Sequence, residues 1–162
     1  MDLHDVMKTT LKSELYKLAS SFREAIIVAI KNGDIVEENM HGFPQGCCTY
    51  ASDLLQKYLY EQGIDTLLMS GIYGYGCDGE SHSWLETKDG TVVDITGDQY
   101  THKEPRFTTA VYVGTRNNGF HNLFELYDPI PYHENTGQLG HKGLEQRFLN
   151  RYEKVLKHIK TT

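Results

Sequence analysis

One short turn, Lys88-Asp89-Gly90, constrains the fold of this chain most, because it joins two runs typical of β-strands, 81–87 and 91–96. A three-residue loop places Gly90 in the left-handed conformation that such loops favour. A two-residue loop would shift the pairing by one position and turn the side chains of one strand to the other face of the sheet. We predict the three-residue loop.

This register decides which side chains can meet. His82 becomes the diagonal neighbour of Asp94 on one face of the hairpin, at a separation that long side chains can span. The opposite face is apolar and would join the core, with Leu85, Val93 and Ile95. The hairpin therefore predicts that the imidazole of His82 and the carboxyl group of Asp94 lie close together.

Apolar periodicity predicts helices before and after this hairpin. The predicted elements, in chain order, are helices at about 5–31 and 47–62, strands at 64–73, 81–87, 91–96 and 108–114, and a helix at 143–160. Gly33 and Gly63 are suited to end the first two helices. The segments 35–46 and 116–141 are interpreted as mostly irregular, and 74–79 as a glycine-rich loop.

Composition limits the class of protein. A chain of 162 residues is typical of one domain, and its net charge of −6 argues against a general nucleic-acid-binding protein. The apolar run 25–30 is too short to cross a membrane, and residues 1–5 lack the features of a signal peptide. Three cysteines make no disulfide framework. We therefore expect a cytoplasmic protein with reduced thiols and no nucleic-acid or membrane partner.

A thiol lies where a glycine-bearing loop enters the second predicted helix, in the stretch 43–52, Phe-Pro-Gln-Gly-Cys-Cys-Thr-Tyr-Ala-Ser. The unpaired amides and the dipole at a helix start stabilise a thiolate and lower the pKa of the thiol. Helical periodicity does not distinguish Cys47 from Cys48, because each shares a face with apolar residues of this helix.

Cysteine, histidine and aspartate in this order form a plausible catalytic set. His82 would take or share the thiol proton, and Asp94 would hold the imidazole in the correct tautomer and orientation. Backbone amides at the helix start could stabilise the oxyanion of a tetrahedral intermediate. The pattern indicates nucleophilic catalysis by a cysteine.

These segments resemble the papain-like and transglutaminase-like superfamily of cysteine enzymes. Residues 46–51, Gly-Cys-Cys-Thr-Tyr-Ala, are similar to its Gly-x-Cys-x-x-Ala motif. His82-Ser83-Trp84 resembles its His-x-Trp strand, and Asp94-Ile95-Thr96 resembles its Asp-x-Thr strand. The resemblance covers about 46–96, and its Gly-x-Cys spacing favours Cys48 over Cys47.

The resemblance implies an α+β fold, in which a central helix carrying the cysteine packs on an antiparallel sheet. In a single domain, 1–162, it places a helical N-terminal part at 1–33, the catalytic core at 43–114 and a C-terminal helix at 143–160. It implies acyl transfer through a thioester on a peptide, protein or small amide, as in a peptidase, a deamidase or a transglutaminase. The implied catalytic residues are Cys48, His82 and Asp94, with no cofactor and no metal. Gln45 is the nearest side-chain candidate for the oxyanion site, and His41 and Gln99 could line the cleft.

Two alternatives remain open at this point. Cys47, Cys48, Cys77 and His82 are potential zinc ligands, although they lack the short paired spacing of structural zinc sites. The chain could also be a non-catalytic binding, regulatory or immunity-type domain on the same scaffold. In that case, His82 would not reach either cysteine.

Overall fold

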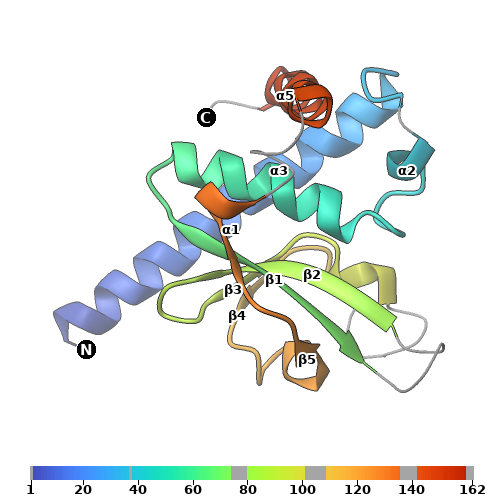
Figure 1. Ribbon diagram of the computed structural model, residues 1–162. Coiled ribbons are helices and arrows are strands. Elements are labelled where there is room, and N and C mark those ends of the chain that lie inside the picture. The colour runs from blue at the N-terminus through green and yellow to red at the C-terminus, as the bar shows by residue number, and fades with distance from the viewer. Residues whose placement is uncertain (1, 37, 74–79, 101–108, 136–141, 160–162) are drawn as a thin grey trace.

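The computed structural model describes residues 2–36, 38–73, 80–100, 109–135 and 142–159. In these ranges the chain forms an α+β fold, in which helices lie over one face of an antiparallel sheet (Figure 1). The α+β class is therefore confirmed. None of the helices formed by the described residues combines the length and apolar character that a membrane crossing requires.

The helices are α1 (Leu3–Lys31), α2 (Glu38–His41), α3 (Cys48–Glu61) and α5 (Lys142–Leu156), and the strands are β1 (Thr66–Tyr73), β2 (Glu80–Thr87), β3 (Val92–Asp94), β4 (Tyr112–Gly114), β5 (Glu125–Leu126) and β6 (Ile130–Pro131).

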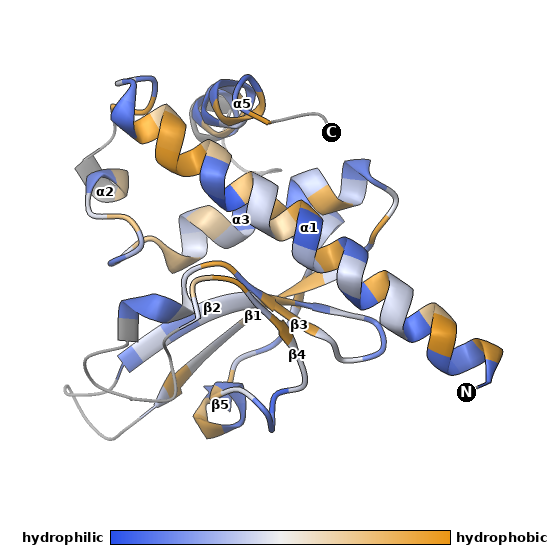
Figure 2. Cartoon of the chain, turned by 180° about the vertical axis from the view of Figure 1, so that it is seen from behind, coloured by the Kyte–Doolittle hydropathy of each residue, from blue (hydrophilic) through white to orange (hydrophobic). Residues whose placement is uncertain are grey.

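The long first helix is confirmed, and its two ends follow from local chemistry. The Asp2 side chain caps the helix start by accepting a hydrogen bond from the amide of Asp5 at 2.9 Å. Beyond the helix end, Gly33 has a φ of +76°, the left-handed conformation that closes a helix. The buried face begins only in the middle of α1, and the N-terminal turns project beyond the sheet (Figures 1 and 2). Its buried residues recur at helical spacing: Leu15, Ala19, Phe22, Ala25, Ile26 and Ala29.

The predicted hairpin and its register are confirmed. Strand β2 pairs with β3 so that Leu85 lies opposite Val93, and the amide of Thr87 donates to the carbonyl of Thr91 at 3.0 Å. Gly90 has a φ of +85°, which a side chain would strain. The sheet order is β4-β3-β2-β1-β5, and β6 also pairs with β1.

The two faces of the sheet bury different clusters, as the alternation along a strand requires. Leu85 and Val93 pack with buried residues of α1, α3 and α5 in the main core. Trp84 and Val92 point the other way, into a smaller cluster with Met69, Phe120 and Phe124. Strands β1, β2 and β3 each contribute side chains to both clusters, so the sheet itself separates them.

Several predicted boundaries were wrong, and the two segments interpreted as irregular contain short regular elements. The segment 35–46 contains the short helix α2, and 116–141 contains β5 and β6, which pair with β1. Strand β4 covers only the last three residues of the predicted 108–114, and helix α5 ends at residue 156 rather than 160. Two-residue strands such as β5 gain their order from pairing with a longer neighbour, so local pattern does not reveal them. The predicted loop 74–79 lies outside the described residues.

Candidate functional site

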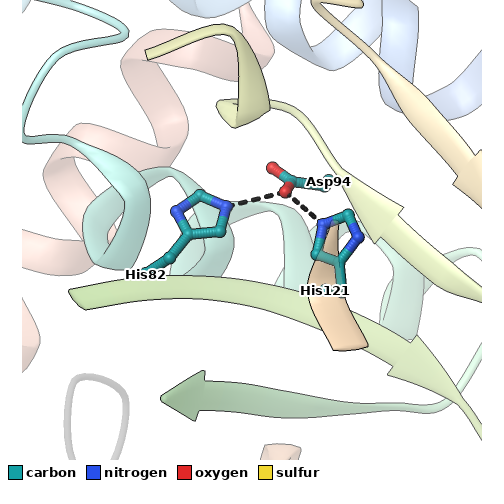
Figure 3. Close-up of side chains that lie close together, drawn as sticks. All are labelled: His82, Asp94 and His121. Atoms are coloured by element: carbon teal, nitrogen blue, oxygen red, sulfur yellow. Dashed lines mark hydrogen bonds and ion pairs between the residues drawn. The ribbon is translucent and has the colours of Figure 1, made fainter. Parts of the chain in front are cut away.

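Asp94 is the centre of a buried polar cluster at the end of β3. Its Oδ2 accepts hydrogen bonds from Nε2 of His82 and from Nε2 of His121, each at 2.7 Å (Figure 3). Its Oδ1 accepts the backbone amide of Thr96 at 2.9 Å and the Thr96 hydroxyl at 3.5 Å. The Asp94 side chain is only 1% exposed, so these donors take the place of water around its charge.

The carboxyl group of Asp94 is held in its ionised form. Burial alone would raise its pKa, but the charge of His82 and the hydrogen bonds from His121 and His82 lower the pKa well below its ordinary value. Because an ionised carboxylate only accepts hydrogen bonds, Nε2 of both imidazoles must carry a proton. The cluster therefore fixes the tautomer of each histidine when that histidine is neutral.

The second ring nitrogen of His82, Nδ1, faces the side-chain amide of Gln99. Nδ1 lies 2.9 Å from Nε2 of Gln99, and His82 also forms a hydrogen bond with the thiol of Cys48. Burial lowers the pKa of His82, but the charge and hydrogen bond of Asp94, with a smaller contribution from Cys48, raise it to about 9. The structure thus brings the predicted residues Cys48, His82 and Asp94 into one chain of contacts.

Cys48 is the first residue of α3 and is partly exposed. Burial would raise the pKa of its thiol, whereas the hydrogen bond and charge of His82 lower it. Smaller contributions come from the backbone of Ser83 and the side chain of Gln99, so the pKa of Cys48 is lowered overall. A lowered pKa increases the fraction of thiolate, which is the nucleophilic form.

Cys47 has a different environment, although it is the adjacent residue. It is fully buried in the main core, and its thiol donates to the backbone carbonyl of Gln45 at 3.3 Å. Burial, with a smaller effect of Cys48, raises the pKa of Cys47 to about 11. Structure therefore separates two cysteines that helical periodicity could not distinguish.

The glutamine nearest to the cluster is Gln99 rather than Gln45. The side chain of Gln45 is exposed, whereas Gln99 is buried and contacts both His82 and Cys48. Gln99 lies in a 3₁₀-helix, Gly97–Tyr100, which directly follows the strand of Asp94. The sequence predicted Gln99 only as a residue that could line the cleft. His41 is exposed at the end of α2.

His121 belongs to the cluster but was not predicted. It begins a short 3₁₀-helix, His121–Leu123, and is 1% exposed between the rings of Trp84, Phe120 and Tyr112. Its Nδ1 has no hydrogen-bond partner among the described residues. No motif or spacing links residue 121 to residue 94, so only the folded chain reveals this contact.

Three residues of the cluster could also hold a metal ion. One donor atom from each of His82, Asp94 and His121 lies within 4.8 Å of the other two, and imidazole and carboxylate are ligands that suit zinc. Of the zinc ligands weighed from the sequence, this set contains only His82, and Cys77 lies outside the described residues. A histidine that binds a metal usually donates its other N–H to a partner, and His121 has none among the residues that the structure describes. In this structure the Nε2 atoms of both histidines donate to Oδ2 of Asp94, each at 2.7 Å.

Comparisons of the chain with protein-family models, with curated proteins and with solved structures gave no match.

Proposed function

We propose that this protein is a cysteine-dependent enzyme that acts on an amide through a thioester intermediate. The observation that carries the proposal is the hydrogen bond between the Cys48 thiol and His82, whose opposite nitrogen is held by Asp94. In the rival interpretation as a non-catalytic domain, His82 has no reason to reach a cysteine. The raised pKa of Cys47 and the lowered pKa of Cys48 favour Cys48 as the nucleophile.

In the first half of the reaction, the Cys48 thiolate attacks the carbonyl carbon of the amide, and a C–S bond forms. The oxyanion of the tetrahedral intermediate accepts hydrogen bonds from amides at the start of α3, which have no acceptor within the helix. The Gln99 side chain is a better placed auxiliary donor than Gln45. The C–N bond then breaks as Nδ1 of protonated His82 gives its proton to the leaving amine.

In the second half, water or an acceptor amine attacks the thioester, and Nδ1 of His82 accepts a proton from that nucleophile. The C–S bond breaks, the carboxylic acid or the new amide leaves, and the Cys48 thiolate is restored. Throughout the cycle Nε2 of His82 keeps its proton on Asp94, so that Nδ1 alone exchanges protons. The substrate class is a peptide, a protein or a small amide.

The proposal also gives α3 the place of the central cysteine-bearing helix in a papain-like or transglutaminase-like core. Supporting contacts come from the first turns of α3 to the strand of His82. The Ser52 hydroxyl donates to the carbonyl of Ser83 at 3.3 Å, and the hydroxyls of Thr49 and Ser83 lie 3.2 Å apart. Because the mechanism needs a reduced thiol, it also fits the proposed cytoplasmic location.

Trapping an acyl-enzyme tests this proposal. With p-nitrophenyl acetate, wild-type protein is expected to gain one hydroxylamine-sensitive acetyl group on Cys48, since the leaving group makes the thioester form faster than it is hydrolysed. In His82→Ala, acetylation should slow by about 100-fold or more, because the thiol loses its acid–base partner. The measurement is the site-resolved rate of acetylation by mass spectrometry.

His133→Ala is the matched control, since His133 is exposed and contacts Tyr60 on another part of the surface. It should acetylate at the wild-type rate. Equal rates in wild type and in His82→Ala, or acetyl groups found only on lysines, would rule out the proposed catalysis.

A further inference from the structure

Arg23 of α1 contacts the connection between β3 and β4, which carries Gln99. Nη1 of Arg23 donates to the backbone carbonyl of Ile95 at 2.5 Å and to that of Ala110 at 3.2 Å. Ile95 immediately follows Asp94 at the end of β3, and Ala110 lies just before β4. Arg23 therefore joins the two ends of the connection between these strands.

The same guanidinium also holds the residue beside Gln99. Its Nη1 and Nη2 donate to the two carboxylate oxygens of Asp98 at 3.0 and 2.8 Å, in a bidentate arrangement. The Arg23 side chain is 11% exposed, so this ion pair is better shielded than a surface pair. Asp98 and Gln99 lie in the same 3₁₀-helix, Gly97–Tyr100. A rotation of this helix that moved Gln99 away from His82 would therefore break the ion pair between Arg23 and Asp98.

A further contact of Arg23 reaches the cysteine side of the site. Its Cζ lies 5.0 Å from the centre of the Phe43 ring, in a cation–π arrangement. Phe43 lies in the loop that leads from α2 into α3 and Cys48. One side chain thus contacts both the loop that enters the nucleophile helix and the connection that leaves the strand of Asp94. Its own backbone is anchored, because Phe22 and Ala25 beside it on α1 are fully buried.

We propose that Arg23 is a positioning residue, which holds Gln99 against Cys48 and His82 by clamping the connection between β3 and β4. Arg23 itself touches neither the thiol nor the imidazole in the contacts described above, so it acts through Gln99. This inference rests on the proposed cysteine chemistry. Lysine cannot replace it fully, because an ammonium group cannot form the planar fork that bonds Asp98 and two carbonyl groups together.

The test compares Arg23→Met and Arg23→Lys by the rate of Cys48 alkylation with iodoacetamide between pH 5 and pH 9. Arg23→Met is expected to shift the rise of the profile upward by about one pH unit, so that the rate at pH 6 falls about tenfold. Arg23→Lys should fall between Arg23→Met and wild type. In a Gln99→Ala background, Arg23→Met should add less than about a twofold further loss, since the two residues act in series.

A stability control separates positioning from general destabilisation. His158→Ala removes the contact of His158 with Asp34, 2.6 Å apart, beyond the C-terminal end of α1. It should lower the melting temperature without moving the alkylation profile. If Arg23→Met does not fold, Arg23→Lys carries the comparison.

These measurements distinguish failure of the positioning role of Arg23 from failure of the proposed cysteine chemistry. If wild-type Cys48 shows a shifted profile and the Arg23 variants match it, or if Arg23→Met has its full effect in the Gln99→Ala background, the positioning role is wrong. If wild-type Cys48 reacts like a free cysteine, the proposed function fails and the role of Arg23 fails with it.

Discussion

Cys48→Ala is expected to abolish the fast alkylation of this protein by iodoacetamide at pH 6, whereas Cys47→Ala is expected to leave it within about twofold of wild type. The Cys48 thiol is partly exposed and its pKa is lowered by His82, while Cys47 is buried and its pKa is raised to about 11. Since the thiolate is the reactive form, Cys48 should react at least tenfold faster than Cys47 at this pH. Peptide mass spectrometry assigns the label to each cysteine.

The adjacent cysteine serves as the internal control, because the two residues share one loop and one helix start. Cys47→Ala leaves a small cavity in the core and should cost about 1 kcal/mol of unfolding free energy without changing the chemistry of Cys48. If Cys47→Ala loses the label and Cys48→Ala keeps it, then Cys47 is the reactive thiol and the assignment of Cys48 as the nucleophile is wrong.

Asp94→Asn is expected to have the largest effect on stability, lowering the unfolding free energy by about 3–5 kcal/mol. The substitution keeps the shape of the side chain but removes the charge that accepts hydrogen bonds from His82 and His121. Buried His82 then loses the partner that keeps its pKa near 9, so it is neutral at pH 6. The alkylation rate of Cys48 at pH 6 should therefore fall by about tenfold or more. Urea denaturation and alkylation kinetics provide the two measurements.

Asp128→Asn is the matched control, since Asp128 is exposed and the substitution removes the same charge. We expect it to change the unfolding free energy by less than about 0.5 kcal/mol. The effect of Asp94→Asn should also depend on pH. A carboxyl group with a lowered pKa stabilises the fold above its ordinary pKa of about 3.9 and loses that contribution as the pH falls. His82, whose pKa Asp94 raises to about 9, adds stability below its ordinary pKa of about 6.5 and loses that contribution as the pH rises toward 9. The difference between wild type and Asp94→Asn should therefore be largest between about pH 4 and pH 6.5 and shrink on either side, and a difference that does not depend on pH would contradict the role of Asp94.

The hairpin shows what local sequence can predict. Lys88-Asp89-Gly90 allows two loop lengths, but only the three-residue loop buries Leu85 together with Val93. Turn chemistry and burial therefore agree on one register. That register alone brings His82 and Asp94 to one face of the hairpin, where they meet.

Contacts between distant parts of the chain were beyond such reasoning. His121 reaches Asp94 from a segment interpreted as mostly irregular, and Arg23 reaches Asp98 from a helix in which the sequence points to no functional residue. Strand β5 was missed for a similar reason, since its order comes from β1. A Cβ added at Gly71 of β1 would lie 2.7 Å from the carbonyl oxygen of Glu125, so only a glycine allows this close approach. Such close approaches leave no periodic signal in the sequence.

The most direct test of the account is the pH dependence of Cys48 alkylation in the wild-type protein, compared with glutathione and with His82→Ala. Because the pKa of Cys48 is lowered and that of His82 is raised to about 9, thiolate and imidazolium should coexist over a range of pH below 9. We expect a rate that rises well below the ordinary thiol pKa of about 8.5 and stays level until His82 loses its proton near pH 9. We also expect His82→Ala to remove this plateau. A single rise near pH 8.5, identical in wild type, His82→Ala and glutathione, would contradict the central claim that His82 activates Cys48.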